Sequence, residues 1–228
     1  MSSVPYSITL SVPYSTTLSV PYSTTLSVPY STTLSVPYST TLSVPYGTMD
    51  TMTRTDDVVV TMVSTPVGRI RLAVTTVGLA GLTWEGRELP GAELPPAADD
   101  GRSTPVAHQL VEYFEGRRRG FEVEVDWRYA EGTQRQVLQT LYDGVGFGKS
   151  ITYGELAERS GTGVPARGIG AIMGSNPMPL VVPCHRVVAH DGLGGYSGGV
   201  DGNGLEVKRW LLTLEGVLPP TFDWPAFP

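Results

Sequence analysis

The chain has 228 residues, of which 40% are apolar, and a net charge of −6, which fits a globular protein of one or two domains. It has no apolar run long enough to cross a bilayer, and its start lacks the features of a signal peptide. Its single cysteine, Cys184, excludes an internal disulfide, and three histidines are too few to make a structural zinc site an expectation. We therefore expect a cytoplasmic protein without membrane segment or metal.

The first 50 residues are dominated by a repeat. Residues 3 to 50 are six copies of one octamer, which reads SVPYSTTL in four of them. A proline at every eighth position interrupts a helix or a central strand, and the apolar content is too low to offset the entropy of ordering. We expect residues 1–50 to be a low-complexity tail, disordered or loosely extended. The alternative is a Tyr-rich segment for self-association.

Residues 57–131 predict an N-terminal α/β domain. The runs VVVTMVST, GRIRLAVTT and GLAGLTWEGRE, separated by turn residues, predict an antiparallel meander. A Pro-, Gly- and Asp-rich loop over 89–103 leads to TPVAHQLVEYFEG, a helix with Thr104 as N-cap and Pro105 in its first turn. FEVEVDW alternates and predicts another strand. The apolar stripe expected on the helix consists of Val106, Leu110, Val111 and Phe114.

Residues 132–218 predict a helical C-terminal domain, followed by a tail over 219–228. A helix over QRQVLQTLYDGV is capped by Thr133, and two short helices, TYGELAERSG and PARGIGAIMGSN, flank a glycine turn. Such a pair is typical of a helix-turn-helix. The second helix carries three glycines, each costing about 1 kcal/mol relative to alanine. They indicate a face kept thin for close helix packing or for approach to a ligand, from which Arg167 projects.

The cysteine lies in NPMPLVVPCHRVVAH, residues 176–190. Asn176 precedes a proline, which ends the helix there, and MPLVV predicts a short buried strand. A thiol with a pKa of about 8.5 needs a base or a positive field to act as a nucleophile, and His185 and Arg186 are candidates. Neighbours on an extended segment point opposite ways, so His185 reaches Cys184 only through a turn or a water. By residue type alone, a lone cysteine such as Cys184 is more often a small buried apolar side chain than a reactive thiol.

PCHRVV, preceded by GSNPMPLVV and followed by GGYSGG and VKRWLLTLEG, resembles the O6-alkylguanine-DNA alkyltransferase family. GKSITYGELAERSG and ARGIGAIMGSNP match it in order and spacing. The resemblance covers about residues 57–216 and is most specific over 134–216. It implies an α+β fold, with an N-terminal antiparallel sheet and helices of ribonuclease H-like type and a C-terminal winged-helix-like, helix-turn-helix domain.

The resemblance implies DNA repair by direct, irreversible, single-turnover transfer of the alkyl group from O6-alkylguanine, and from O4-alkylthymine, to a cysteine. Cys184 would be the acceptor, His185 the base acting through a water, and Glu215 the residue that orients the imidazole. Tyr153 would donate to guanine N3, and Asn176 would pin the turn around the site. No cofactor is implied. The substrate pocket would be lined by Val187, Tyr196, Ser197 and Lys208, with the carbonyls of Cys184 and Val187 accepting from the exocyclic amine.

The implied partner is double-stranded DNA, bound through the minor groove by a monomer that associates with the nucleoid in a bacterium. The damaged nucleotide must rotate out of the stack, and Arg167 would fill the gap. Minor-groove contact is largely sequence-independent, which suits repair in any sequence. The other residues implied at the DNA are Tyr153, Ala166, Gly168 and Ser175.

Two departures from the family pattern stand out. An insertion, VDGNG over 200–204, lengthens the pocket loop, and we expect it to alter the placement of Ser197 and the alkyl groups that fit. Pro165 stands where a small residue is expected, but proline is tolerated at a helix start. Two other functions were weighed. A non-catalytic alkyl-damage-binding protein would lack the acceptor cysteine, and a cysteine hydrolase using Cys184 and His185 would leave the helix-turn-helix unexplained.

Overall fold

The computed structural model describes residues 58–90 and 99–220, and the backbone of five short strands within the octamer repeat. The chain forms two compact units, Met1–Thr53 and Arg54–Pro228. The predicted loop over 89–103 lies partly outside the described residues, and the tail over 219–228 lies mostly outside them. In the part of the chain that the structure describes, no helix has the length and apolar character needed to cross a membrane.

In the first unit, the strands lie between the prolines of the repeat. They are β1 (Ser7–Ile8), β2 (Leu18–Ser19), β3 (Thr24–Val28), β4 (Thr32–Val36) and β5 (Thr41–Leu42). β3 and β4 are antiparallel and each ends at the residue before a proline, which has no N–H to extend the ladder. Most residues of the repeat are outside those described, and the disordered tail over 1–50 stays a prediction.

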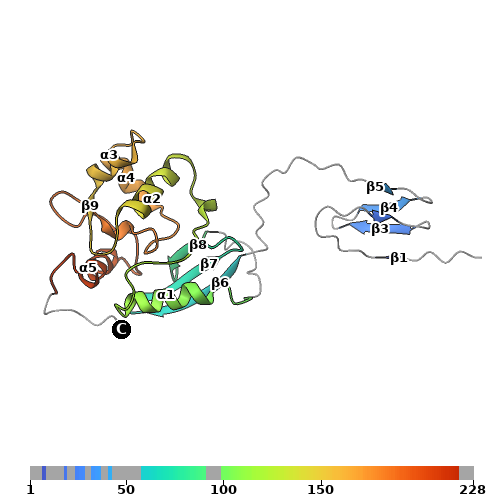
Figure 1. Ribbon diagram of the computed structural model, residues 1–228, viewed down its shortest axis with the longest axis horizontal. Coiled ribbons are helices and arrows are strands. Elements are labelled where there is room, and N and C mark those ends of the chain that lie inside the picture. The colour runs from blue at the N-terminus through green and yellow to red at the C-terminus, as the bar shows by residue number, and fades with distance from the viewer. Residues whose placement is uncertain are drawn as a thin grey trace, which may run out of the picture. The chain divides into compact units, whose positions relative to one another are not determined.

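The second unit begins with the predicted antiparallel meander, which is confirmed. Strands β6 (Val59–Thr65), β7 (Gly68–Val74) and β8 (Leu79–Trp84) form a sheet in that order. Gly68 has a φ of +105° at the first turn, a conformation that favours glycine. All six residues of β8 are buried, because β8 faces the rest of the unit (Figure 1).

Helix α1 (Thr104–Phe114) packs against β6, and two details of its prediction are wrong. The N-cap is Ser103 rather than Thr104, so the helix starts one residue early. Val111 is 37% exposed, whereas Gln109 and Tyr113 are buried. The predicted stripe counted apolar residues only and so missed two polar side chains on the inner face.

The predicted strand FEVEVDW is also wrong. It runs as extended chain with a single parallel bridge, between Val125 and Leu79. The Gln109 side chain forms the hydrogen bonds that a neighbouring strand would otherwise make with Glu122. Its Oε1 accepts from Glu122 N at 2.7 Å, and its Nε2 donates to Glu122 O at 3.2 Å. A short 3₁₀ helix, η2 (Trp127–Tyr129), follows.

The helical half contains α2 (Gly132–Gly144), α3 (Tyr153–Ser160), α4 (Ala166–Gly174) and α5 (Gly204–Leu214). α2 starts at Gly132 with Glu131 as N-cap, so the predicted Thr133 cap is wrong. α3 and α4 form the expected helical pair. α3 opens with a capping box, in which Thr152 and Glu155 exchange hydrogen bonds, and ends at Gly161 with a φ of +61°.

The segment before the cysteine is buried, as expected, but it is a turn and not a strand. Val182 N donates to Met178 O at 2.8 Å, and Leu180 has a φ of +73°. Asn176 closes this turn: its Oδ1 accepts from Met178 N at 3.0 Å and its Nδ2 donates to Val182 O at 2.8 Å. A 3₁₀ helix, η3 (Cys184–Arg186), follows, and then β10 (Val187–Val188) pairs in parallel with β9 (Ile151–Thr152).

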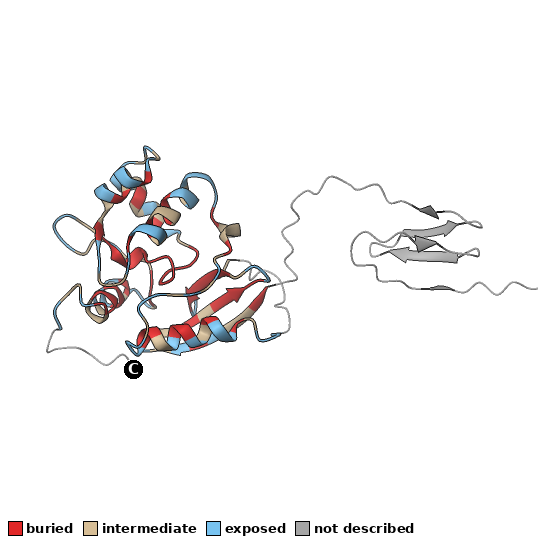
Figure 2. Cartoon of the chain, viewed as in Figure 1, coloured by how far each residue is buried: buried red, intermediate tan, exposed pale blue. Residues whose placement is uncertain are grey.

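One apolar core joins the sheet half to the helical half (Figure 2). It includes Leu82 and Leu110 from the first and Leu138 and Leu211 from the second. Leu82 N of the edge strand β8 also donates to Pro177 O at 2.8 Å, so the sheet braces the turn that leads to the cysteine. The predicted α+β class, with an antiparallel sheet followed by a helical half, is confirmed.

Candidate active site

Cys184 is the first residue of η3 and is only 3% exposed. Burial raises the pKa of its thiol, and the Asn176 hydrogen bond and the Lys208 charge oppose this only in part. The resting group is therefore a neutral thiol. It needs a base at the moment it reacts.

His185 is the nearest candidate for that base. Its Nε2 lies 3.0 Å from Glu215 Oε1, and both side chains are fully buried. An ionised carboxylate only accepts, so Nε2 carries the proton and Nδ1 is left as the acceptor. Nδ1 is buried and has no hydrogen-bond partner among the described residues. Burial lowers the pKa of His185, with Glu215 opposing and Arg186 adding to the effect, so the ring stays neutral.

Glu215 is the centre of a wider network than the sequence predicts. Arg186 donates to it from Nη2 at 2.9 Å and from Nε at 3.0 Å, Tyr113 Oη donates at 2.7 Å, and Gly148 N donates at 3.3 Å. Burial favours the protonated acid, but His185 and Arg186 outweigh it and lower the pKa of Glu215 to about 2. The carboxylate is thus ionised at neutral pH.

Two members of this network, Arg186 and Tyr113, were not predicted in these roles. Arg186 was named only as a positive neighbour of the thiol, and Tyr113 was not named at all. The available signal was weak: Tyr113 lies three residues after Leu110, on the buried face of α1, and a buried phenol needs a partner for its hydroxyl.

Lys208 is completely buried beside the thiol. Its Nζ donates to Val187 O at 2.6 Å and to Gly195 O at 2.9 Å, and it lies 5.8 Å from the centre of the Tyr153 ring. Burial lowers the pKa of Lys208 to about 8, and the electrostatic interaction with Cys184 opposes this only in part. The carbonyl of Val187 therefore already has a donor, and that of Cys184 accepts from Val187 N.

A cavity of about 520 Å³ brings the thiol together with α4 and the pocket loop. Tyr153, Ala166, Arg167, Cys184, Tyr196 and Ser197 line it, with Gly170, Met173, Gly174 and Gly195. The other predicted site residues are not part of this lining; they are His185, Val187, Lys208, Glu215, Gly168, Ser175 and Asn176, of which Ser175 and Asn176 line a second cavity. Tyr153 Oη donates to Gly195 O at 3.3 Å, and burial raises the pKa of this phenol, which stays protonated.

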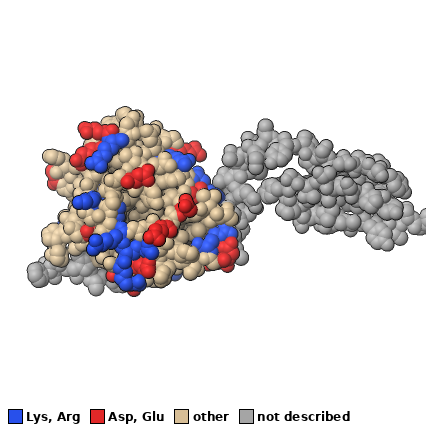
Figure 3. Space-filling view, in the orientation of Figure 1, with Lys and Arg blue, Asp and Glu red and all other residues tan. Residues whose placement is uncertain are grey.

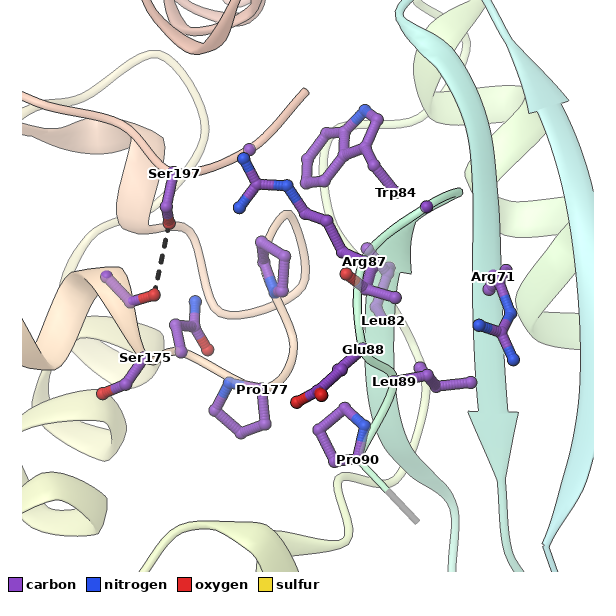
Figure 4. A pocket seen from close by; sticks show the side chains of 16 residues that line it. Arg71, Leu82, Trp84, Arg87, Glu88, Leu89, Pro90, Ser175, Pro177 and Ser197 are labelled. Atoms are coloured by element: carbon purple, nitrogen blue, oxygen red, sulfur yellow. Dashed lines mark hydrogen bonds between the residues drawn. The ribbon is translucent and has the colours of Figure 1, made fainter. Parts of the chain in front are cut away.

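A larger cavity, of about 1030 Å³, separates the sheet half from the pocket loop (Figure 4). The two cavities share Gly174 and Ser197, whose hydrogen bond of 3.4 Å is drawn in Figure 4. Arg87 extends from beyond β8 toward the loop and donates from Nε to Gly199 O at 3.1 Å. The inserted residues 200–203 form a turn closed by Asn203, whose Oδ1 accepts from Val200 N at 2.9 Å, and the last inserted residue, Gly204, begins α5.

The N-terminal part of α4 is exposed, including Ala166 and Arg167, and Ser175 beyond its end is exposed too. Over the face drawn in Figure 3, basic side chains are interspersed with acidic ones. Within residues 58–90 and 99–220, no group of three or more His, Cys, Asp and Glu side chains could hold a metal ion.

Two family models match the chain. Residues 58–127 match the ribonuclease-like domain of 6-O-methylguanine DNA methyltransferase, and residues 132–217 match its DNA binding domain. The fold and the two matched models thus define the class of the 6-O-methylguanine DNA methyltransferases, with a ribonuclease-like domain before a DNA binding domain. The chain belongs to the family of the methylated-DNA–protein-cysteine methyltransferases.

Curated relatives carry that name. The protein of Mycolicibacterium paratuberculosis is 36% identical over 159 residues, which are 67% of this chain and 89% of the relative. The protein of Methanopyrus kandleri is 39% identical over 132 residues, 58% of this chain and 94% of the relative. The mouse protein is 40% identical over 123 residues, 54% of this chain but only about half of the relative, 49%.

Solved structures agree. The crystal structure of Mycobacterium tuberculosis O6-methylguanine methyltransferase is 32% identical, with a TM-score of 0.60, and the match covers 72% of this chain and 96% of that one. A structure of the M. tuberculosis protein OGT in complex with DNA is 33% identical, with a TM-score of 0.58, covering 68% and 90% of the two chains.

Proposed function

We propose that this chain repairs DNA by moving the alkyl group of O6-alkylguanine to Cys184, where it stays as a thioether. Repair of DNA by alkyl transfer to a protein cysteine is the activity of the family to which the chain belongs. The observation that carries the assignment of the residue is the single cysteine, buried on the wall of a cavity with the neutral imidazole of His185 next in sequence.

In the proposed reaction, the Cys184 sulfur attacks the alkyl carbon, the carbon–O6 bond breaks, and its electron pair remains on guanine. The thiol proton leaves through a water to His185 Nδ1, the ring nitrogen that Glu215 does not use. Guanine gains one proton, which Tyr153 helps to deliver while it contacts N3. A thioether is not readily reversed, so each chain reacts once.

Substrate recognition is assigned to the residues around the cavity. Tyr196 and Ser197 line it and would donate toward O6, and Asn176 holds the turn that fixes Cys184. Lys208 occupies the Val187 carbonyl and supplies a buried positive charge beside the sulfur, which favours the thiolate as it forms. The exocyclic amine of the guanine would donate to the carbonyl oxygens of Cys184 and Val187. Each oxygen already accepts one hydrogen bond and has a second lone pair for the amine.

DNA is the partner of this chain, and the finer geometry is part of the proposal. α4 enters the minor groove, where Ala166, Gly168 and Ser175 present little bulk. Arg167 takes the place of the rotated nucleotide, which keeps its base in the cavity beside Tyr153. A monomer acting in the cytoplasm fits this single-site reaction. O4-alkylthymine is a second substrate of the same site.

The domain division is proposed as 57–131 for the α/β part and 132–218 for the DNA-binding and alkyl-acceptor part. The octamer repeat over 1–50 and the residues from 219 to 228 are outside both. The relatives that match are named as methyltransferases. Their names favour alkyl transfer over the alternative, a non-catalytic damage-binding protein.

The decisive measurement is the intact mass of the protein after incubation with a duplex that contains O6-methylguanine. We expect a gain of one methyl group, mapped to Cys184 and absent in Cys184→Ala, while the variant still binds the duplex. Lesion binding without a mass gain in the natural chain would instead support the damage-binding function.

A further inference from the structure

Tyr113 links the ribonuclease-like half to the buried carboxylate of the acceptor site. It lies on α1, 102 residues before Glu215, and its hydroxyl donates to Glu215 Oε1 at 2.7 Å. The side chain is completely buried. This is the only hydrogen bond from a side chain of residues 58–90 or 99–131 to Glu215 in the described part of the chain.

The ring of Tyr113 is held from three sides. Its centre lies 5.5 Å from that of Phe114, 5.2 Å from that of Phe121 and 6.2 Å from that of Phe147. A ring clamped in this way has no room to swing its hydroxyl to water. Burial and the charge of Glu215 raise the pKa of Tyr113 well above 10, so the hydroxyl is always a donor.

The same oxygen, Oε1, also receives the hydrogen bond of His185 Nε2. Arg186 donates to both oxygens, and Gly148 N donates to Oε2. Tyr113 adds a donor from a different element, α1, to Oε1, the oxygen that His185 contacts. Among the described residues, the His185 ring has a hydrogen bond to Glu215 alone, so the direction of its free Nδ1 depends in part on the position of the carboxylate.

We propose that Tyr113 is a positioning residue for the alkyl transfer: its hydroxyl fixes the Glu215 carboxylate, which holds His185 as the Nε2–H tautomer with Nδ1 free to take the thiol proton. The ribonuclease-like half thereby contributes to the chemistry of the site, and not only to the shared core. The inference rests on the proposed function for its rate effect, but the tautomer of His185 can be measured without any transfer.

The test is Tyr113→Phe, which keeps the ring and its packing and removes only the hydroxyl. The matched control is Tyr142→Phe, which removes a hydroxyl from a half-buried tyrosine on α2 whose ring packs edge-to-face with Trp127. Two quantities are measured: the single-turnover rate of methyl transfer from an O6-methylguanine duplex, and the ring ¹⁵N spectrum of His185. The spectrum is assigned with His185→Gln, since the chain has only three histidines.

We expect Tyr113→Phe to transfer about tenfold more slowly, the size of one lost hydrogen bond to a charged group, with unchanged affinity for the duplex. We also expect a mixture of His185 tautomers in this variant and a single Nε2–H form in the natural chain and in Tyr142→Phe. A merely structural role would lower the melting temperature and leave the tautomer unchanged.

Two results would overturn the inference while leaving the proposed function intact. The first is a Tyr113→Phe variant that transfers the methyl group at the rate of the natural chain and shows a single His185 tautomer. The second is an Nδ1–H tautomer of His185 in the natural chain. The second result decides the matter even if the variant does not fold. A natural chain that transfers no methyl group overturns the function instead, and the tautomer comparison then decides the positioning by itself.

Discussion

The buried acceptor network and the exposed start of α4 differ in how their polar groups are satisfied. His185, Glu215 and Lys208 are almost entirely buried, and each has hydrogen bonds to protein groups. Arg167, on the wall of the same cavity, is exposed and has no ion pair or hydrogen bond among the described residues. The proposed acceptor network is thus assembled within the protein itself, whereas Arg167, which we propose to contact DNA, has no such partner among the described residues.

The largest expected effect comes from removing the negative charge of Glu215, which lies at the centre of the buried network. We expect Glu215→Gln to leave Arg186 buried without its counter-ion, which lowers the free energy of unfolding by about 3 kcal/mol. It also leaves His185 without a pure acceptor, and we expect methyl transfer to slow about a hundredfold. Urea unfolding and single-turnover kinetics measure the two effects.

The control for this change is Glu158→Gln, which removes one negative charge from the exposed face of α3. It should leave both quantities within error of the natural chain. Equal losses in the two variants would mean that net charge, and not the buried network, is responsible.

Acid should break the same network reversibly and to a smaller extent. The pKa of Glu215 is about 2 in the folded chain, against an ordinary value of 4.5, so its stabilising effect is complete above pH 4.5 and is lost as the pH falls toward 2. From this carboxyl alone we expect a loss of about 2 kcal/mol between pH 7 and pH 3. The difference in unfolding free energy between the natural chain and Glu215→Gln should shrink over that range. A constant difference would contradict the lowered pKa.

The smallest of the expected effects comes from a substitution at the exposed start of α4, and it tests whether this region contributes only to DNA binding. We expect Arg167→Ala to slow transfer from duplex DNA about tenfold, without a change in stability, because an exposed arginine that contacts DNA contributes only to the complex. Reaction with free O6-benzylguanine base should be unchanged. Arg135→Ala, on the exposed side of α2, is the matched control and should transfer at the natural rate. Equal slowing on the free base would place Arg167 in the chemistry.

The sequence predicted what local patterns determine. The meander of β6 to β8 and the helical pair of α3 and α4 follow from alternation, capping residues and glycines, which act over a few neighbours. The strand expected over MPLVV failed because the Asn176 amide closes a turn across it, a contact that apolar content does not encode. FEVEVDW failed because Gln109, from another element, satisfies its backbone.

The sequence predicted some residues of the candidate site and missed others. The proximity of Cys184, Tyr153, Arg167 and Ser197 was expected from a resemblance, and the structure places them on one cavity. The hydrogen bond of Tyr113 depends on the packing of α1 against the helical half, and the pairing of Arg186 with Glu215 depends on the packing of α5 against η3. Nothing within a few residues of Tyr113 indicates a carboxylate 102 residues further along the chain.

That separation has a consequence for how the protein is made. The ribosome adds residues from the N-terminus, so Tyr113 and His185 are synthesised before Glu215, the acid that both of them contact. Until α5 has emerged and docked, Arg186 and His185 lack the Glu215 carboxylate. Burial of η3 would then leave their polar groups without this partner. A chain caught midway through translation therefore carries Cys184 and His185 without the carboxylate that His185 contacts, and we expect alkyl transfer only after Glu215 has been added and α5 has docked.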